Sequence, residues 1–149
     1  MLKKLLSRII HIAKWIPVLW KDNDWDYEYL LRIIKFKLEC MREYHRNYGH
    51  TKDHNKIADE IHKCVLVLNR IIEDDYSVYA SHYKKWGEPV LETANGHLDI
   101  VHENCVTEKD KEQERKEFLE CAHREYNMKV QDLKYFSKLF SKHLFKWWD

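Results

Sequence analysis

The spacing of apolar residues predicts helices along most of the chain, beginning with residues 2–16. In this segment apolar side chains recur on one side of a helix and basic side chains on the other. The apolar members are Leu2, Leu5, Leu6, Ile9, Ile10, Ala13 and Ile16, and the basic members are Lys3, Lys4, Arg8, His11 and Lys14. Pro17 lacks a backbone N–H, so we expect it to stop or kink this helix.

Two further helices are predicted in the middle of the chain. One begins near Asp24 and ends at Gly49, and the other runs from about residue 52 to 75 with Thr51 as a possible N-cap. The first has a buried stripe at Tyr27, Leu30, Leu31, Ile34, Leu38, Met41 and Tyr48. The second has apolar residues at alternating steps of four and three, at Ile57, Ile61, Cys64, Leu68 and Ile71. That alternation is typical of a helix packed in a coiled-coil-like seam.

The C-terminal half is expected to hold a short aromatic helix, a loop and one very long helix. The short helix ends at Gly87, the segment GEPVLETANGH is read as a loop, and the last helix runs from after Thr107 to about Phe145. No strand pattern is recognised. We therefore predict an all-α protein, a bundle of four to five helices in one domain over residues 1–149, with its main bundle over about 24–146. The length of the last helix favours a homo-oligomer.

Composition and charge narrow the function classes. The 149 residues include 3 Gly, and no glycine-rich loop or GxSxG element occurs, which argues against nucleotide-binding folds of the P-loop or Rossmann kind and against a serine hydrolase. The formal net charge of +1 combines basic ends with an acidic middle. The four cysteines form no CxxC pair, and no apolar run is long enough to span a membrane. We expect a protein of the cytoplasm, without a transmembrane segment.

Two patterns resemble metal sites. Asp22, Asp24 and Asp26 imitate the first ligands of an EF-hand loop, but Tyr27 stands where that loop needs Gly and Ile33 where it needs Glu. These acids are better explained as helix-capping residues.

The other pattern consists of ExxH, at Glu120 and His123, and DxxH, at Asp59 and His62. On two helices, these would resemble half of a di-iron carboxylate site. With 10 His and 25 acidic residues, chance matches are expected. We assign no catalytic residue, metal ligand or cofactor, and keep a metal-dependent enzyme as an alternative.

The most unusual charge feature is a row of lysines at steps of four, Lys134, Lys138, Lys142 and Lys146. A solvated helix face explains it as well as an anion-binding row does. Tyr135 and the terminal tryptophans Trp147 and Trp148 lie close by in sequence, and lysine beside stacking aromatics is the chemistry of nucleotide binding. We expect the terminal tryptophans to dock on the Trp15–Trp25 segment. The predicted ligand contacts are Trp20, Lys21, Trp25, Tyr27, Lys134, Tyr135 and Lys138.

The segment WIPVLWKDNDWDYEYLL, together with the terminal WWD, resembles small helical proteins encoded by tailed bacteriophages. The likeness is best in the N-terminal third and the last few residues. It implies an early or accessory phage protein acting in the cytoplasm of a bacterial host. It brings no activity or site residue with it.

Four functions remain open at this point. The first is a non-enzymatic counter-defence protein that binds and sequesters an anionic nucleotide signalling molecule. The second is a helical interaction module that inhibits a host protein or serves as a virion accessory protein. The third is the metal-dependent enzyme built on the ExxH and DxxH helices. The fourth is binding to a membrane surface through the basic amphipathic helix at residues 2–16.

Overall fold

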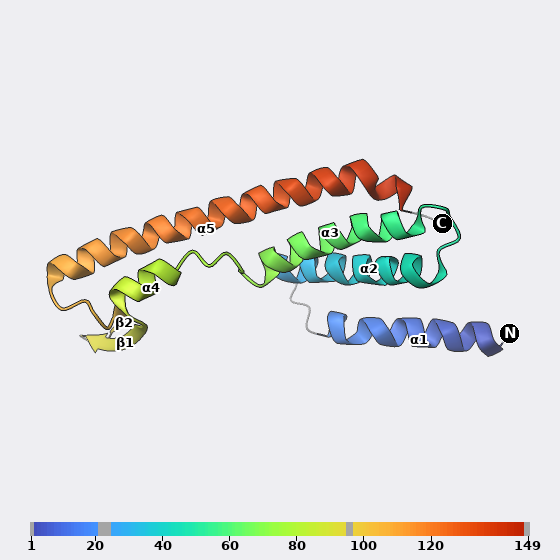
Figure 1. Cartoon of the computed structure of the whole chain (residues 1–149). Helices are drawn as coiled ribbons and strands as arrows, with labels where there is room; N and C mark the ends of the chain where they lie inside the picture. Colours follow the sequence, from blue (N-terminus) through green and yellow to red (C-terminus); the bar gives the residue numbers. More distant parts are fainter. Residues whose placement is uncertain (1, 21–24, 95–96, 148–149) are drawn as a thin grey trace. The chain divides into compact units, whose positions relative to one another are not determined.

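The computed structural model describes residues 2–20, 25–94 and 97–147, and it confirms the all-α class with a long C-terminal helix. Figure 1 shows its elements. They are α1 (Leu2–Leu19), α2 (Tyr27–Tyr48), α3 (His54–Ile72), α4 (Ala80–Trp86), β1 (Pro89–Ala94), β2 (His97–His102), α5 (Glu108–His143) and a 3-10 turn, η1 (Leu144–Lys146).

The chain divides into two compact units. Unit 1 comprises Met1–Asp75 with Asp132–Asp149, and unit 2 comprises Tyr76–Gln131. Helix α5 supplies its first part to unit 2 and its last part to unit 1. The single domain and the homo-oligomer expected from the sequence stay predictions.

The core of unit 1 follows the predicted seam of α3. Ile61, Cys64, Leu68 and Ile71 are at most 5 % exposed, and Leu31 and Leu38 of α2 pack against them with Phe136 and Trp147. Each such side chain contributes about 1.5–3 kcal/mol when fully buried, so this layer is the main source of stability in unit 1. Burial also raises the pKa of the Cys64 thiol to about 11, which keeps it a neutral apolar group.

Helix α2 differs from its prediction at its start and along its stripe. Its N-cap is Asp26, whose carboxylate accepts a hydrogen bond from the Glu28 backbone N–H at 2.9 Å, rather than Asp24, which lies outside the described residues. Three predicted stripe members, Tyr27, Leu30 and Tyr48, are exposed. Tyr27 is the first residue of the helix. Leu30 lies off the seven-residue seam formed by the buried residues Leu31, Leu38 and His45, and Tyr48 is the last residue of the helix.

The other helix ends are close to their predicted positions. Helix α3 begins after Asp53 rather than after Thr51. Helix α1 continues to Leu19 with Pro17 inside it, so the proline does not stop it. A proline removes only its own N–H from the ladder, and the Trp20 N–H still bonds to the Ile16 carbonyl at 2.8 Å.

The segment read as a loop is a β-hairpin, which corrects the prediction. Strands β1 and β2 pair antiparallel in the register Pro89↔His102 to Ala94↔His97. The Asn-Gly dipeptide between them is the strongest short hairpin signal, and a proline is tolerated as the first residue of a strand. The hairpin belongs to unit 2, where it positions the site described next.

Candidate functional site

The predicted ligand residues do not form one packed cluster. Trp20, Trp25 and Tyr27 are 85 %, 84 % and 65 % exposed, so none of them is covered by another part of the described chain. Lys21 lies outside the described residues. Lys134, Tyr135 and Lys138 are exposed on α5.

The terminal tryptophan docks, but its partner differs from the prediction. Trp147 is 3 % exposed in the unit 1 core, stacks on His143, and its Nε1 donates to Glu60 Oε2 of α3 at 3.4 Å. Trp15 instead meets Phe36 of α2 edge-on at 4.8 Å between ring centroids. The aromatic wall expected at the Trp15–Trp25 segment is therefore wrong for Trp147, and Trp148 lies outside the described residues.

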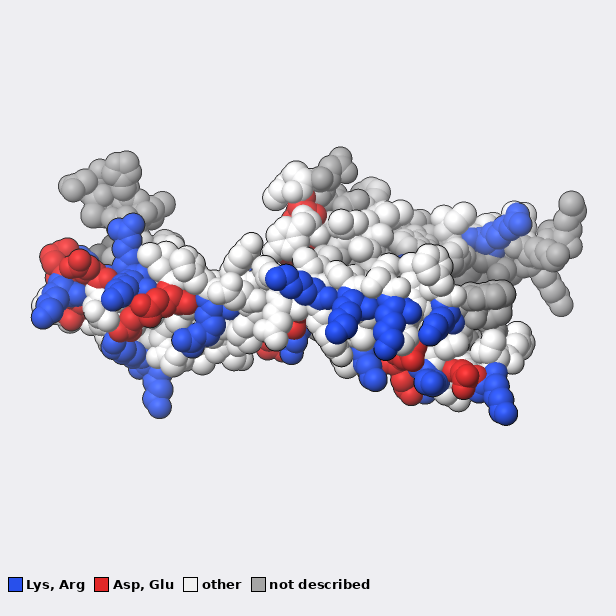
Figure 2. All heavy atoms as spheres, turned by 90° about the horizontal axis from the view of Figure 1, so that it is seen from above, with Lys and Arg blue, Asp and Glu red and all other residues white. Residues whose placement is uncertain are grey.

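The lysine row is a solvent-facing row of basic side chains, and Figure 2 shows such a row along α5. Lys134, Lys138, Lys142 and Lys146 are all exposed. None of the four is paired with a carboxylate of residues 25–94 or 97–147. The carboxylate next to the row, Asp132, is taken by Arg70, whose Nε donates to it at 2.6 Å. The row therefore keeps its positive charge unneutralised.

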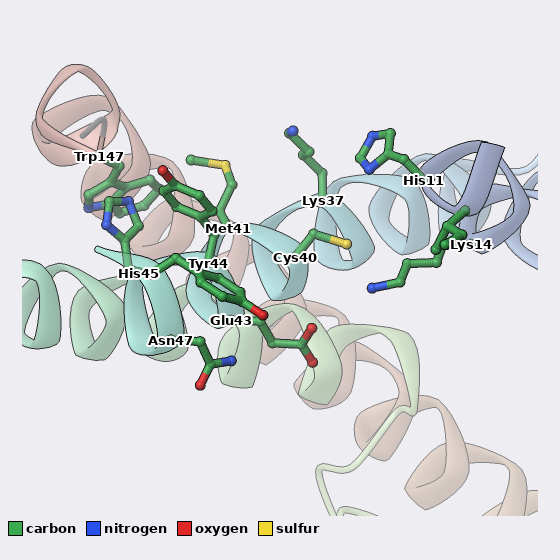
Figure 3. Close-up of a pocket in the computed structure, with 12 residues that line it drawn as sticks. His11, Lys14, Lys37, Cys40, Met41, Glu43, Tyr44, His45, Asn47 and Trp147 are labelled. Carbon is green, nitrogen blue, oxygen red and sulfur yellow. The ribbon is translucent and has the colours of Figure 1, made fainter. Parts of the chain in front are cut away.

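A cavity of about 640 Å³ in unit 1 opens between α1 and α2, with Trp147 at one end (Figure 3). Its polar lining includes His11 and Lys14 from α1 and Lys37 and Glu43 from α2. The side chains carry both signs of charge and spread along the cavity rather than converge on one point (Figure 3). The described side chains of this cavity therefore do not form a convergent binding site.

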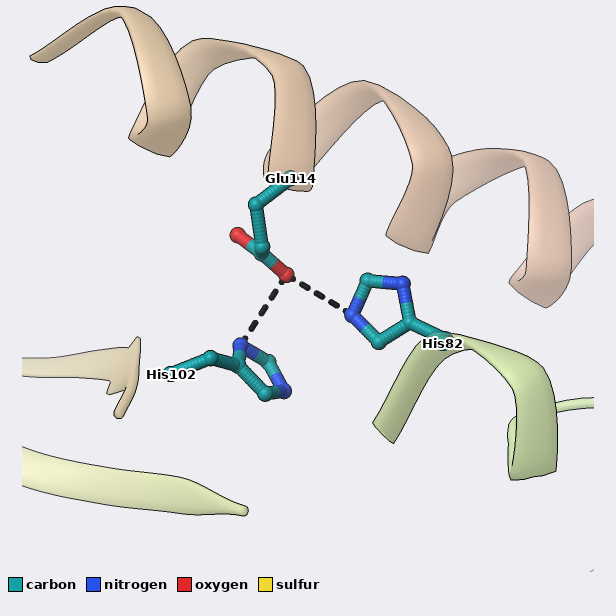
Figure 4. Close-up of side chains that lie close together, drawn as sticks. All are labelled: His82, His102 and Glu114. Carbon is teal, nitrogen blue, oxygen red and sulfur yellow. Dashed lines mark hydrogen bonds and ion pairs between the residues drawn. The ribbon is translucent and has the colours of Figure 1, made fainter. Parts of the chain in front are cut away.

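A different group of side chains converges in unit 2 (Figure 4). His82 of α4, His102 at the end of β2 and Glu114 of α5 meet around one carboxylate oxygen. Glu114 Oε1 is 3.0 Å from His82 Nε2 and 3.0 Å from His102 Nδ1. The two imidazole rings cross nearly at right angles, with centroids 4.9 Å apart.

The local chain path explains how three separate elements reach this point. Gly87 ends α4 with a φ of +80°, a conformation that favours glycine, and turns the chain into β1. The hairpin then returns, because the Asn104 N–H bonds to the Trp86 carbonyl at 2.9 Å, which brings His102 back beside α4. Thr107 and Asp110 cap α5 reciprocally, with N–H···O distances of 3.2 and 2.9 Å, and so set the position of Glu114 one turn later.

The cluster is buried and incompletely hydrogen-bonded. His82, His102 and Glu114 are 4 %, 4 % and 9 % exposed. His82 Nδ1 and both ring nitrogens of His102 are buried and have no hydrogen-bond partner of adequate geometry among the described residues. Buried polar atoms are normally satisfied, and a buried carboxylate needs a positive partner. His82 Nε2 already makes a hydrogen bond to Glu114 Oε1, whereas His102 Nδ1 lies at the same distance without adequate hydrogen-bond geometry. A cation bound to one nitrogen of each ring would satisfy His102 Nδ1 and neutralise the carboxylate, and it would leave His82 Nδ1 unchanged.

The donor set fits a transition metal. Ligand atoms at 2.0–2.1 Å around tetrahedral zinc are about 3.3 Å apart, and both nitrogens already lie near that distance from the Glu114 oxygen. All three donor atoms lie within 4.8 Å of one another. Two imidazoles and a carboxylate also suit ferrous iron, whereas magnesium and calcium prefer oxygen alone.

A second layer of contacts holds the helices that carry the cluster. Glu117, one turn after Glu114 on α5, accepts hydrogen bonds from Lys85 Nζ at 2.6 Å and from Trp86 Nε1 at 2.7 Å. Together with Gln113, these donors lower the pKa of Glu117 to about 2. Phe118 packs against His82 with a centroid distance of 5.6 Å. Helix α4 is thus held on α5 at His82 itself and one turn after it.

A cavity of about 700 Å³ lies against the cluster within unit 2. His102 and Glu114 line it together with Cys105, Lys111 and Arg115. Burial and the Glu114 carboxylate raise the pKa of the Cys105 thiol, which places that thiol within electrostatic reach of the cluster. A metal held by the three ligands would therefore have one side toward a cavity with basic residues on its wall.

Motif spacing in the sequence does not predict this cluster, and the residues that it favours as metal ligands lie elsewhere. Asp59 is paired with Arg46 at 2.5 Å and His62 is hydrogen-bonded to Arg42 at 3.0 Å. Glu120 and His123 are exposed. The intervals from His82 to His102 to Glu114 match no familiar ligand spacing, and the return of the hairpin is what brings the residues together. The Asn-Gly dipeptide in the sequence was the signal that could have revealed it.

Comparisons with known proteins add no assignment, since the chain matches no protein-family model, no curated protein and no solved structure.

Proposed function

We propose that this protein binds a divalent transition metal, zinc in the first place, through His82, His102 and Glu114. The observation that carries the proposal is the convergence of three buried donor atoms from three elements, of which His102 Nδ1 lacks a hydrogen bond of adequate geometry. The nitrogen and oxygen donors and their spacing are those of zinc sites with two histidines and one carboxylate.

The metal has a clear structural task in unit 2. Among the residues of unit 2 whose side-chain burial is described, the buried apolar ones are Tyr76, Val78 and Trp86, and the other buried ones are the three ligands themselves. Units below about 70–80 residues rarely hold together by an apolar core alone, and natural ones add disulfides or a metal. The cysteines of the described chain are free thiols. Zinc would replace the missing core by tying α4, β2 and α5 together.

Three protein ligands leave one coordination position for water or another donor. The adjoining cavity, with Lys111 and Arg115 on its wall, lies where that position can open, and Cys105 is the residue best placed to close it. Three-ligand zinc sites with a free position are the catalytic kind, and four-ligand sites are the structural kind. Substituting cobalt for zinc distinguishes a three-ligand site from a four-ligand site. If Cys105 is the fourth ligand, its thiolate adds a sulfur-to-cobalt charge-transfer band to the absorption spectrum, and Cys105→Ser removes that band.

The first experiment is calorimetric titration of the chelator-stripped protein with zinc. We expect one zinc per chain in the wild-type protein and a loss of affinity of at least tenfold in His102→Ala, because one of three ligands is gone. His123→Ala is the matched control, since His123 is an exposed histidine of the same unit. Zinc binding that is absent from the wild-type protein, or equally reduced in His123→Ala, would contradict the proposal.

A second candidate function rests on the lysine row. We propose that the row binds an anionic nucleotide-type molecule, which is the role expected of a phage accessory protein that sequesters a host signalling nucleotide. The supporting observation is that four exposed lysines at one-turn spacing have no carboxylate partner in the described chain. Tyr135, 47 % exposed beside the row, offers a ring for base stacking.

This candidate is tested by a thermal-shift screen with cyclic dinucleotides, cyclic oligonucleotides and ADP-ribose isomers. A ligand at a hundredfold excess over its dissociation constant adds about 2.7 kcal/mol, which shifts Tm by several degrees. Lys134→Gln/Lys138→Gln should abolish the shift, and Lys84→Gln/Lys116→Gln, two exposed lysines of unit 2, should keep it. If no nucleotide raises Tm, the candidate falls and a host-protein partner becomes the next one to test.

A further inference from the structure

Helix α1 exposes an apolar face that no described part of the chain covers. Every large apolar side chain on that face is more than half exposed. They are Leu5 at 57 %, Leu6 at 59 %, Ile9 at 53 %, Ile12 at 62 %, Ile16 at 54 % and Leu19 at 52 %. Contiguous exposed apolar surface of this kind marks a binding surface rather than an ordinary solvent face.

The side of α1 that faces the rest of unit 1 is the more polar one. His11 and Lys14 line the cavity beside α2 (Figure 3), and Trp15 contacts Phe36. Residues 11, 14, 15 and 18 recur at helical spacing on this side, opposite the exposed apolar residues. If α1 only completed the unit 1 core, its apolar face would point toward α2 and its polar face toward solvent.

Charge indicates what kind of surface would cover the apolar face. Residues 2–20 contain Lys3, Lys4, Arg8 and Lys14 and no acidic residue. A partner must therefore be both apolar and anionic, which describes a bilayer with acidic headgroups. A second copy of α1 would bring like charges together. No helix of the described chain has the length and apolar character needed to cross a bilayer.

We propose that α1 is an in-plane amphipathic anchor that binds the surface of an anionic lipid bilayer. Its face of Leu5, Ile9, Ile12 and Ile16 enters the boundary between headgroups and acyl chains. Lys3, Lys4 and Arg8 supply positive charge for the lipid phosphates, whereas Lys14 lines the cavity beside α2. Trp20, 85 % exposed one turn beyond Ile16 on the same face, suits the interfacial layer. This surface is independent of the metal site and of the lysine row.

Flotation with vesicles of phosphatidylcholine, with and without about one third phosphatidylglycerol, tests the proposal. The full chain should float with the anionic vesicles, and high salt should release it. Ile9→Glu/Ile16→Glu should lower the bound fraction at least tenfold. The matched control is Leu66→Glu, because Leu66 is an apolar residue of α3 that is 56 % exposed. Circular dichroism confirms that each variant is folded.

The basic residues supply a second arm of the test. Each is expected to contribute about fivefold to binding of anionic vesicles, so Lys3→Gln/Lys4→Gln should weaken it by more than tenfold. Failure of the wild-type protein to float would overturn the proposal. So would flotation that Ile9→Glu/Ile16→Glu leaves intact. Light scattering without vesicles measures whether Ile9→Glu/Ile16→Glu converts an oligomer to a monomer. If it does, and the wild-type protein does not float, the apolar face is a self-association surface and the lipid proposal is wrong.

Discussion

At the scale of single residues, two carboxylates of α5, the half-buried Glu117 and the buried Glu114, have different surroundings. Glu117 has its charge satisfied by protein donors, from Lys85, Gln113 and Trp86. Glu114 has two histidine nitrogens at 3.0 Å, one of which makes no proper hydrogen bond to it. The first carboxylate is complete without a further partner, whereas the second is arranged around a point that a metal can occupy.

The low pKa of Glu117 predicts how the stability of unit 2 depends on pH. The folded-state pKa, about 2, is below the ordinary value of 4.5, so the stabilisation is fully present above pH 4.5 and is lost as pH falls from 4.5 toward 2. Glu117→Gln should lower the free energy of unfolding by about 1 kcal/mol at pH 7 and flatten that pH dependence. Urea unfolding at pH 3 and pH 7 measures both effects. Glu120→Gln, at an exposed position of α5, is the control, and an equal loss in that variant would contradict this account.

At the scale of elements, the hairpin determines whether the site exists. Gly87 starts it with a φ of +80°, and a Cβ there would meet the Glu103 Cβ at 2.9 Å. Gly87→Ala should therefore lower the free energy of unfolding by about 1–3 kcal/mol and weaken zinc binding, because His102 would no longer return to α4. Thermal unfolding with and without zinc measures both. Gly49, whose φ is −61°, is not a left-handed residue, so the argument from backbone conformation applies to Gly87 and not to it.

The helices can be predicted from the sequence, whereas the candidate metal site cannot, and the reason is physical. The seam of Ile61, Cys64 and Leu68 follows from helical periodicity, a local property, and the start of α5 follows from the Thr107 cap. The metal cluster depends on pairing between β1 and β2, in which Pro89 opposes His102. The Pro, Asn and Gly residues of the segment GEPVLETANGH favour a loop when the sequence is read alone. Without that pairing, the three ligands have no reason to meet.

Exposure was also poorly predicted at the two ends of α2 and on α1. Tyr27 and Tyr48 carry the right period for a buried stripe and are exposed, because a periodic pattern does not say how far the partner helix extends. The same limit applies to Leu5 and Ile9, whose amphipathic pattern was recognised while the direction of the apolar face was not. Tertiary contacts decide these cases.

At the scale of the whole molecule, the two units have different sources of stability. Unit 1 has an apolar layer between α2, α3 and the end of α5, closed by Trp147. Unit 2 has three buried apolar residues and three buried metal-type ligands among the residues whose side-chain burial is described. We therefore expect zinc to change the stability of unit 2 and to leave that of unit 1 unchanged.

Hydrogen exchange of the chelator-stripped protein, with and without one equivalent of zinc, tests the central claim most directly. We expect slower exchange in residues 76–94 and 97–131 on adding zinc, little change in α2 and α3, and no effect of zinc in His102→Ala. Exchange rates that zinc leaves unchanged, or protection by zinc confined to unit 1, would contradict the metal centre at His82, His102 and Glu114.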